Sequence, residues 1–150
     1  MVLTLNTASA VISFVTRSEE DAAKFYEQLA AKYPKGTEAF LSFSKENRKN
    51  KVTVERAYYG VISDALEAAF AFKEGLNPAS YTVESGLTES ASYADALNVA
   101  IEKERRIQRL YTESAKLSEG LMADVTRVFQ VMAKKREDRL AKLNALVQAA

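Results

Sequence analysis

Apolar residues recur at steps of three and four along four segments of the chain, the spacing that places side chains on one face of an α-helix. The pattern predicts four helices, over residues 7–32, 37–61, 88–117 and 121–150. Pro34 and Gly36 separate the first two helices, and Gly120 separates the last two, as expected of residues that interrupt a helix. Two short links around one long link predict an all-α, antiparallel four-helix bundle.

The long link joins the second and third helices. Its first part, SDALEAAFAF from Ser63 to Phe72, has the composition of a short extra helix that Ser63 or Asp64 would cap. From residue 73 to 87 the helical period is lost, and Gly75 and Pro78 mark an irregular connection. We therefore expect a long crossover that carries one short helix.

Three aromatic residues in this crossover, Phe70, Phe72 and Tyr81, give it more apolar surface than a connection needs. They either cover one end of the bundle or form the interface of a dimer, since aromatic side chains are enriched at protein interfaces. On this ground the sequence predicts a homodimer.

Composition narrows the classes of protein. The chain has 150 residues, 47% of them hydrophobic, with 5 Gly and 2 Pro, which fits one helical domain spanning residues 1–150. A net charge of +1 implies no nucleic-acid partner. No apolar run is long enough to cross a membrane, and the first fifteen residues lack the basic start of a signal peptide, so we expect no membrane association and a cytoplasmic protein. The absence of Cys and His removes the usual nucleophilic thiolate and the commonest metal ligand.

Polar residues interrupt the apolar stripes near the middle of each predicted helix. In the first helix Glu19 precedes Tyr26 by seven residues, and in the third Glu104 precedes Tyr111 by seven. The two pairs are 85 residues apart, so the halves of the chain repeat. Each glutamate lies either in the core or at the edge of its stripe, and each tyrosine is expected to be a core aromatic whose hydroxyl finds a polar partner.

The second and fourth helices carry a matching pair of interruptions. Asn47 and Asn50 break one stripe, and Arg136 and Arg139 break the other, 89 residues later. The asparagines could be interior hydrogen-bonding groups that fix helix register. The arginines belong to a dense charged run that could instead be a solvated face, with Arg139 pointing outward while Leu140 packs.

Four segments carry a resemblance to a known family. SEEDAAKFYEQLA and EKERRIQRLYTESA resemble the first and third helices of the ferritin-like, rubrerythrin-type proteins, where a ligand Glu precedes a Tyr by seven residues. FSKENRKN and MAKKREDR resemble the Glu-x-x-His motifs of the second and fourth helices. The resemblance implies a ferritin-like fold and a di-metal centre with one Glu from each of two helices and a Glu-x-x-His pair from each of the others.

Position by position, the implied metal site is incomplete in this chain. Glu19 and Glu104 match the single-glutamate ligands, and Tyr26 and Tyr111 match the tyrosines beside the metals. The positions of the two Glu-x-x-His motifs carry other side chains: Asn47, Asn50, Arg136 and Arg139. A shift of register by one residue would place Glu46 and Lys49 in the second-helix motif, but it restores no His. Binding of a metal by two carboxylates and an amide oxygen would be weak.

These replacements lead to a specific hypothesis about the core. Two carboxylates alone in an apolar interior would cost several kcal/mol or take up protons, so they require partners. Arginine suits this role, because its planar guanidinium can bond a carboxylate through two nitrogens. We therefore expect Glu19 and Glu104 to form buried ion pairs with Arg136 and Arg139, without a metal or other cofactor.

Three functions are consistent with this reading. The first is a non-catalytic ferritin-like protein with a structural or interaction role. The second is a di-iron oxidoreductase acting on peroxide or oxygen, which the family resemblance implies but the missing ligands disfavour. The third is a binding protein that holds a small anion between Arg136, Arg139 and the asparagines.

Overall fold

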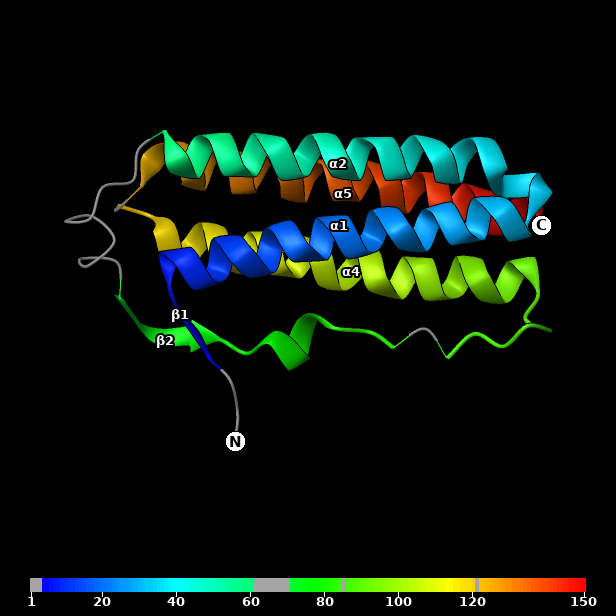
Figure 1. Cartoon of the computed structure of the whole chain (residues 1–150), viewed down its shortest axis with the longest axis horizontal. Coiled ribbons are helices and arrows are strands. Elements are labelled where there is room, and N and C mark those ends of the chain that lie inside the picture. Colours follow the sequence, from blue (N-terminus) through cyan, green and yellow to red (C-terminus); the bar gives the residue numbers. More distant parts are fainter. Residues whose placement is uncertain (1–3, 61–70, 85, 121) are drawn as a thin grey trace.

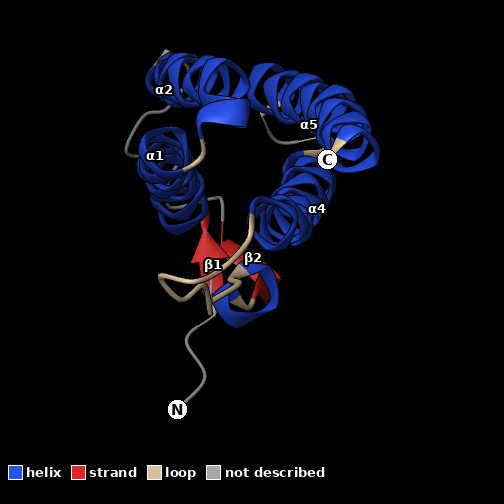
Figure 2. Ribbon diagram, turned by 90° about the vertical axis from the view of Figure 1, so that its right-hand side faces the viewer, coloured by secondary structure: helices blue, strands red, loops and turns tan. Residues whose placement is uncertain are grey.

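A computed structural model describes residues 4–60, 71–84, 86–120 and 122–150. Within them, four long helices lie side by side along one axis (Figure 1): α1 Ala8–Lys32, α2 Thr37–Tyr59, α4 Tyr93–Ser118 and α5 Ala123–Ala149. Viewed along this axis, α1 lies next to α2 and α4 next to α5 (Figure 2). The predicted all-α, four-helix architecture is confirmed. No helix in the described ranges is long and apolar enough to span a membrane.

The link between α1 and α2 follows the sequence signals closely. The Thr7 hydroxyl accepts a hydrogen bond of 3.1 Å from the amide of Ala10 and so caps the start of α1. A single 3-10 turn, Pro34–Gly36, joins the two helices. A Cβ atom on Gly36 would lie 2.5 Å from the Phe40 ring and 2.9 Å from the Tyr93 ring, so a larger residue there would force these rings to shift. The close approach ties the link to the start of α4.

Helix α4 begins later than the sequence predicted. We expected its start near Thr88 or Glu89, but Ser92 is the N-cap and forms a reciprocal capping box with Asp95. In this box the Ser92 hydroxyl accepts a hydrogen bond from the Asp95 amide, and the Asp95 carboxylate accepts one from the Ser92 amide, so two amides at the start of the helix are satisfied.

A two-stranded sheet was not predicted. Strand β1, Leu5–Thr7, pairs antiparallel with β2, Ala71–Leu76, with Leu5 opposite Leu76. The extra helix predicted over 63–72 is therefore wrong at Ala71 and Phe72, because these residues find a strand partner far away in the sequence. Its remaining part, residues 63–70, lies outside the described residues, as does Val61, the predicted last residue of the second helix.

After β2 the crossover runs along the outside of α1 and α4 through the 3-10 turn Pro78–Tyr81 (Figures 1 and 2). Tyr81 is buried, with its ring centroid 6.4 Å from that of Phe14 on α1. It therefore covers the bundle and is not available as a dimer surface. Phe70 and the side chain of Phe72 lie outside the described part of the chain.

Candidate functional site

A group of charged and polar side chains lies in the core, halfway along the bundle. All four helices contribute to it: Glu19 from α1, Asn47 from α2, Glu104 from α4, and Arg136 and Arg139 from α5. Each is at most 2% exposed. We call these five residues the Glu–Arg cluster. Four charges at this depth must be balanced by close partners, because an unpaired buried charge costs several kcal/mol.

Arg136 bridges the two carboxylates. Its Nε donates a hydrogen bond of 2.6 Å to Glu104 Oε2, and its Nη1 donates one of 3.3 Å to Glu19 Oε2. Its Nη2 forms an ion pair with the second oxygen of Glu19. One guanidinium therefore joins α1 to α4, and the predicted ion pairs of Arg136 are confirmed.

Arg139 holds the other side of the same carboxylate. Its Nη1 lies 3.0 Å from Glu104 Oε1 and also donates to Asn47 Oδ1. Its Nη2 donates to the Phe43 carbonyl at 3.3 Å and to Glu46 Oε1 at 2.8 Å. The predicted ion pair between Arg139 and Glu104 is confirmed, and Arg139 in turn connects α4 to α2.

Two side chains near Arg139 differ from expectation. The alternative in which Arg139 points outward while Leu140 packs is wrong in its first half, since Arg139 is buried and Leu140 only partly so. Glu46, considered only as a possible metal ligand, instead pairs with Arg139 from the edge of the core, where its side chain is 40% exposed. Glu46 has this role because the long Arg139 side chain extends across to α2.

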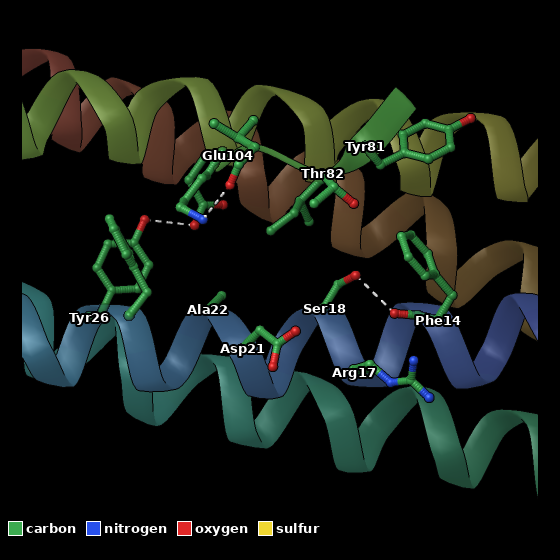
Figure 3. A pocket seen from close by; sticks show the side chains of 13 residues that line it. Phe14, Arg17, Ser18, Asp21, Ala22, Tyr26, Tyr81, Thr82 and Glu104 are labelled. Atoms are coloured by element: carbon green, nitrogen blue, oxygen red, sulfur yellow. Dashed lines mark hydrogen bonds between the residues drawn. The ribbon is translucent and has the colours of Figure 1, made fainter. Parts of the chain in front are cut away.

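Tyr26 belongs to the same network. Its hydroxyl donates a hydrogen bond of 2.7 Å to Glu104 Oε1 (Figure 3), and the Arg139 guanidinium lies 5.5 Å from its ring centroid. The tyrosine of the first half of the chain thus contacts the glutamate of the second half.

Tyr111 occupies the corresponding place in the other half. The Arg136 guanidinium lies 5.9 Å from its ring centroid, and the neighbouring Glu19 carboxylate contributes, after burial, to raising the pKa of its hydroxyl. The sequence repeat is therefore matched by a crossed arrangement in space, in which each tyrosine lies beside the glutamate of the opposite half.

The two asparagines behave differently. Asn47 Oδ1 accepts hydrogen bonds from both arginines, with 3.3 Å to Arg136 Nη2, so it completes the cluster. Asn50 is buried, but neither atom of its amide forms a hydrogen bond with any described residue. The structure therefore brings five of the six predicted positions together and leaves Asn50 outside the network.

The electrostatic setting keeps Glu104 charged. Burial alone would raise the pKa of its carboxyl, but Arg136 and Arg139 overcome this effect and lower the pKa to about 2. For Glu19 the balance is reversed, because burial outweighs the attraction of Arg136 and raises its pKa. Burial also raises the pKa of the Tyr26 hydroxyl, and the Glu104 carboxylate adds to this effect. A permanently ionised carboxylate between two arginines is a poor general acid.

The donor set does not fit a di-metal centre. Such a centre needs several carboxylate or imidazole ligands that converge on one point, and the described residues contain no group of three or more His, Cys, Asp or Glu that could hold a metal ion. Both oxygens of Glu104 and the amide oxygen of Asn47 already accept hydrogen bonds from arginine. A metal cation at this point would also face the positive charges of Arg136 and Arg139.

Comparisons with known proteins identify no relative of this chain. No family model matches the chain, and searches of curated proteins and of solved structures find no match. The class that the fold and the site define is therefore an all-α, four-helix protein with a buried, charge-balanced cluster.

Proposed function

We propose that this chain is a non-catalytic, antiparallel bundle of the ferritin-like, rubrerythrin-related kind, with a structural or interaction role. In this proposal the Glu–Arg cluster stands where a di-metal centre would lie in an active member. The observation that carries it is the Arg136 guanidinium, which bonds one carboxylate from α1 and one from α4. A bridging cation that links two helices through their glutamates is also what a metal would provide.

The competing functions receive less support. Iron-dependent peroxide or oxygen chemistry needs ligands and an open coordination position, and the cluster supplies neither, because its carboxylates are bound by arginine. Anion binding needs unpaired positive groups. Every guanidinium nitrogen of Arg136 contacts a carboxylate. Both Nη atoms of Arg139 are also bonded, and its Nε is the guanidinium nitrogen of the cluster that has no hydrogen-bond partner among the described residues.

Restoring the ligands tests the ferritin-like part of the proposal. The variant Asn47→Glu, Asn50→His, Arg136→Glu and Arg139→His rebuilds both Glu-x-x-His motifs, so it should bind about two divalent metal ions per chain. The natural chain should bind far fewer, because two arginines occupy the site. Equilibrium dialysis against Co²⁺, followed by elemental analysis and visible spectroscopy, measures both, and circular dichroism confirms that the variant is folded.

Two results would count against the proposal. About two tightly bound irons per natural chain, with a visible band that peroxide bleaches, would favour the oxidoreductase. If the restored variant folds but takes up no more metal than the natural chain, the four helices do not have the ferritin-like arrangement that brings these positions together.

The homodimer is also a proposal, and an exposed stripe on α2 supports it. Leu41, Val52 and Tyr59 are large apolar side chains that are 49%, 43% and 66% exposed. Their spacings of eleven and seven residues place them on one face of the helix. Lys45 and Glu55 lie on the same face between them.

Two of the contacts that this stripe would make with its own copy are complementary. If a second copy of α2 packs antiparallel about a two-fold axis, Leu41 lies opposite Tyr59 of the partner subunit. In the same register Lys45 lies opposite Glu55 of the partner subunit, so unlike charges meet. A two-fold interface requires such self-complementarity, because each patch meets its own copy.

Charge reversal tests the dimer. We expect Lys45→Glu and Glu55→Lys each to weaken dimerisation about tenfold, since like charges would meet, and the double variant to restore it. Sedimentation equilibrium measures the association constant, and Lys142→Glu on α5 is the control. A strict monomer at every concentration, or a double variant as weak as the single ones, would exclude this interface.

A further inference from the structure

A cavity of about 120 Å³ lies between α1 and α4, under the crossover. In Figure 3, Tyr26, Ser18 and Phe14 point from α1 toward α4, where Glu104 faces them. Tyr81 and Thr82 of the crossover lie near α4 in this view, and Arg17 and Asp21 lie on the other side of α1. The hydrogen bond between Tyr26 and Glu104 forms part of its wall. The cavity therefore reaches from the surface to the edge of the Glu–Arg cluster.

Most of the cavity wall is apolar and aromatic. Phe14 and Phe25 of α1, Ile107 of α4 and Tyr81 of the crossover line it. Its volume is close to that of an engineered protein cavity of about 150 Å³ that holds a benzene molecule. A single six-membered ring is therefore the size of ligand that this space admits.

The polar groups of the cavity carry a positive excess. Lys103 and Arg17 line it together with one exposed acid, Asp21, while the Glu104 carboxylate is already balanced by arginines. Lys103 is half-buried, and burial lowers the pKa of its ammonium group. An anionic ligand would stabilise the charged form of Lys103.

The charge of Lys103 is balanced only in part. Burial lowers the pKa of its ammonium group, and the nearby Asp21 and Glu104 carboxylates oppose this effect. Its Nζ donates a hydrogen bond of 2.9 Å to the Val83 carbonyl and lies 4.9 Å from the Phe25 ring centroid. Neither Lys103 nor Arg17 forms an ion pair with any residue in the described ranges. The partners of Lys103, a carbonyl and a π-face, fix the direction of the ammonium group without neutralising it.

We propose that this cavity binds a small aromatic carboxylate of one ring. The ring lies between Phe14, Phe25 and Tyr81, and the carboxylate pairs with Lys103, with Arg17 adding positive charge at the mouth. The cavity touches the Glu–Arg cluster through Glu104. The proposal does not depend on the function of that cluster, because the charged groups it uses, Lys103 and Arg17, are not members of it.

Benzoate is the probe, and benzylamine is the matched compound of opposite charge. Titration of the full chain by calorimetry, with chemical shifts of labelled protein as a second readout, should show saturable binding of benzoate and none of benzylamine. Lys103→Met keeps the aliphatic stem but removes the charge, so it should weaken benzoate binding about tenfold. Lys116→Met, an exposed lysine on the same helix, should leave it unchanged.

A second variant tests the volume. Ala22 lines the cavity, so Ala22→Leu should fill it and abolish binding while preserving the helix. Circular dichroism and thermal unfolding check that this variant is folded. If it is not, the comparison of Lys103→Met with Lys116→Met tests the binding site. The proposal is wrong if benzoate shows no saturable binding, if benzylamine binds better, or if Lys103→Met and Lys116→Met behave alike.

Discussion

Replacing Arg136 by methionine is expected to destabilise the protein by about 3–5 kcal/mol. Methionine fills a similar volume, but it leaves Glu19 without an ion-pair partner and removes one of the two arginines from Glu104, both in the core. Domains of this size unfold with about 5–15 kcal/mol, so the loss is a large part of the total. Chemical denaturation of the natural chain and the variant gives the difference directly.

A matched control separates the cluster from the helix. Lys135→Met changes the neighbouring, exposed position of α5 and should alter stability by less than about 0.5 kcal/mol. Adding Glu19→Gln to Arg136→Met should recover part of the loss, since one unpaired charge is removed. If Arg136→Met costs no more than Lys135→Met, the buried ion pairs do not contribute to stability.

The second large effect is a dependence of stability on pH that Glu104 controls. The arginines lower its pKa from 4.5 to about 2 in the folded protein. A carboxyl with a lowered pKa stabilises the fold fully above its unfolded pKa, and this contribution is lost as the pH falls towards the folded value. A shift of this size corresponds to about 3 kcal/mol. We therefore expect Glu104→Gln to cost about 3 kcal/mol at neutral pH and progressively less between pH 4.5 and 2.

The free energy of unfolding of the natural chain and of Glu104→Gln, measured from pH 7 to pH 2, tests this expectation. The difference at each pH cancels the contribution of the surface carboxylates that the two proteins share. Glu19→Gln provides the contrast. The pKa of Glu19 is raised, so the stability of the natural chain relative to this variant should be greatest below pH 4.5 and fall as the pH rises. A constant difference between Glu104→Gln and the natural chain would contradict the account.

The helices and their buried faces could be predicted from sequence because they depend on local spacing. Pro34, Gly36 and Gly120 marked the links correctly. The sheet could not be foreseen, since Leu5 and Leu76 meet only after the chain has folded. The start of α4 could have been predicted, because Ser92 and Asp95 have the spacing of a capping box. Thr88 and Glu89 are also residue types that begin helices, and they led to the earlier start.

The charged part of the site was predictable for a related reason. Glu19, Glu104, Arg136 and Arg139 each interrupt an apolar stripe, and buried charges of opposite sign must meet. The partners of a long side chain at the edge of the core were not predictable, which is why the bond from Arg139 to Glu46 was missed. The cavity beside Lys103 was also missed, because its walls come from three segments that are distant in sequence.

The most direct test of the Glu–Arg cluster is the NMR spectrum of the arginine side chains in protein labelled with ¹⁵N-arginine. Arg136→Lys and Arg139→Lys assign the two signals. Because both guanidiniums are buried and bound to carboxylates, we expect their N–H protons to exchange slowly with water and their Nη groups to give separate resonances. Rapid exchange of both side chains, as in exposed arginines, would contradict a buried ion-pair cluster in the core of the bundle.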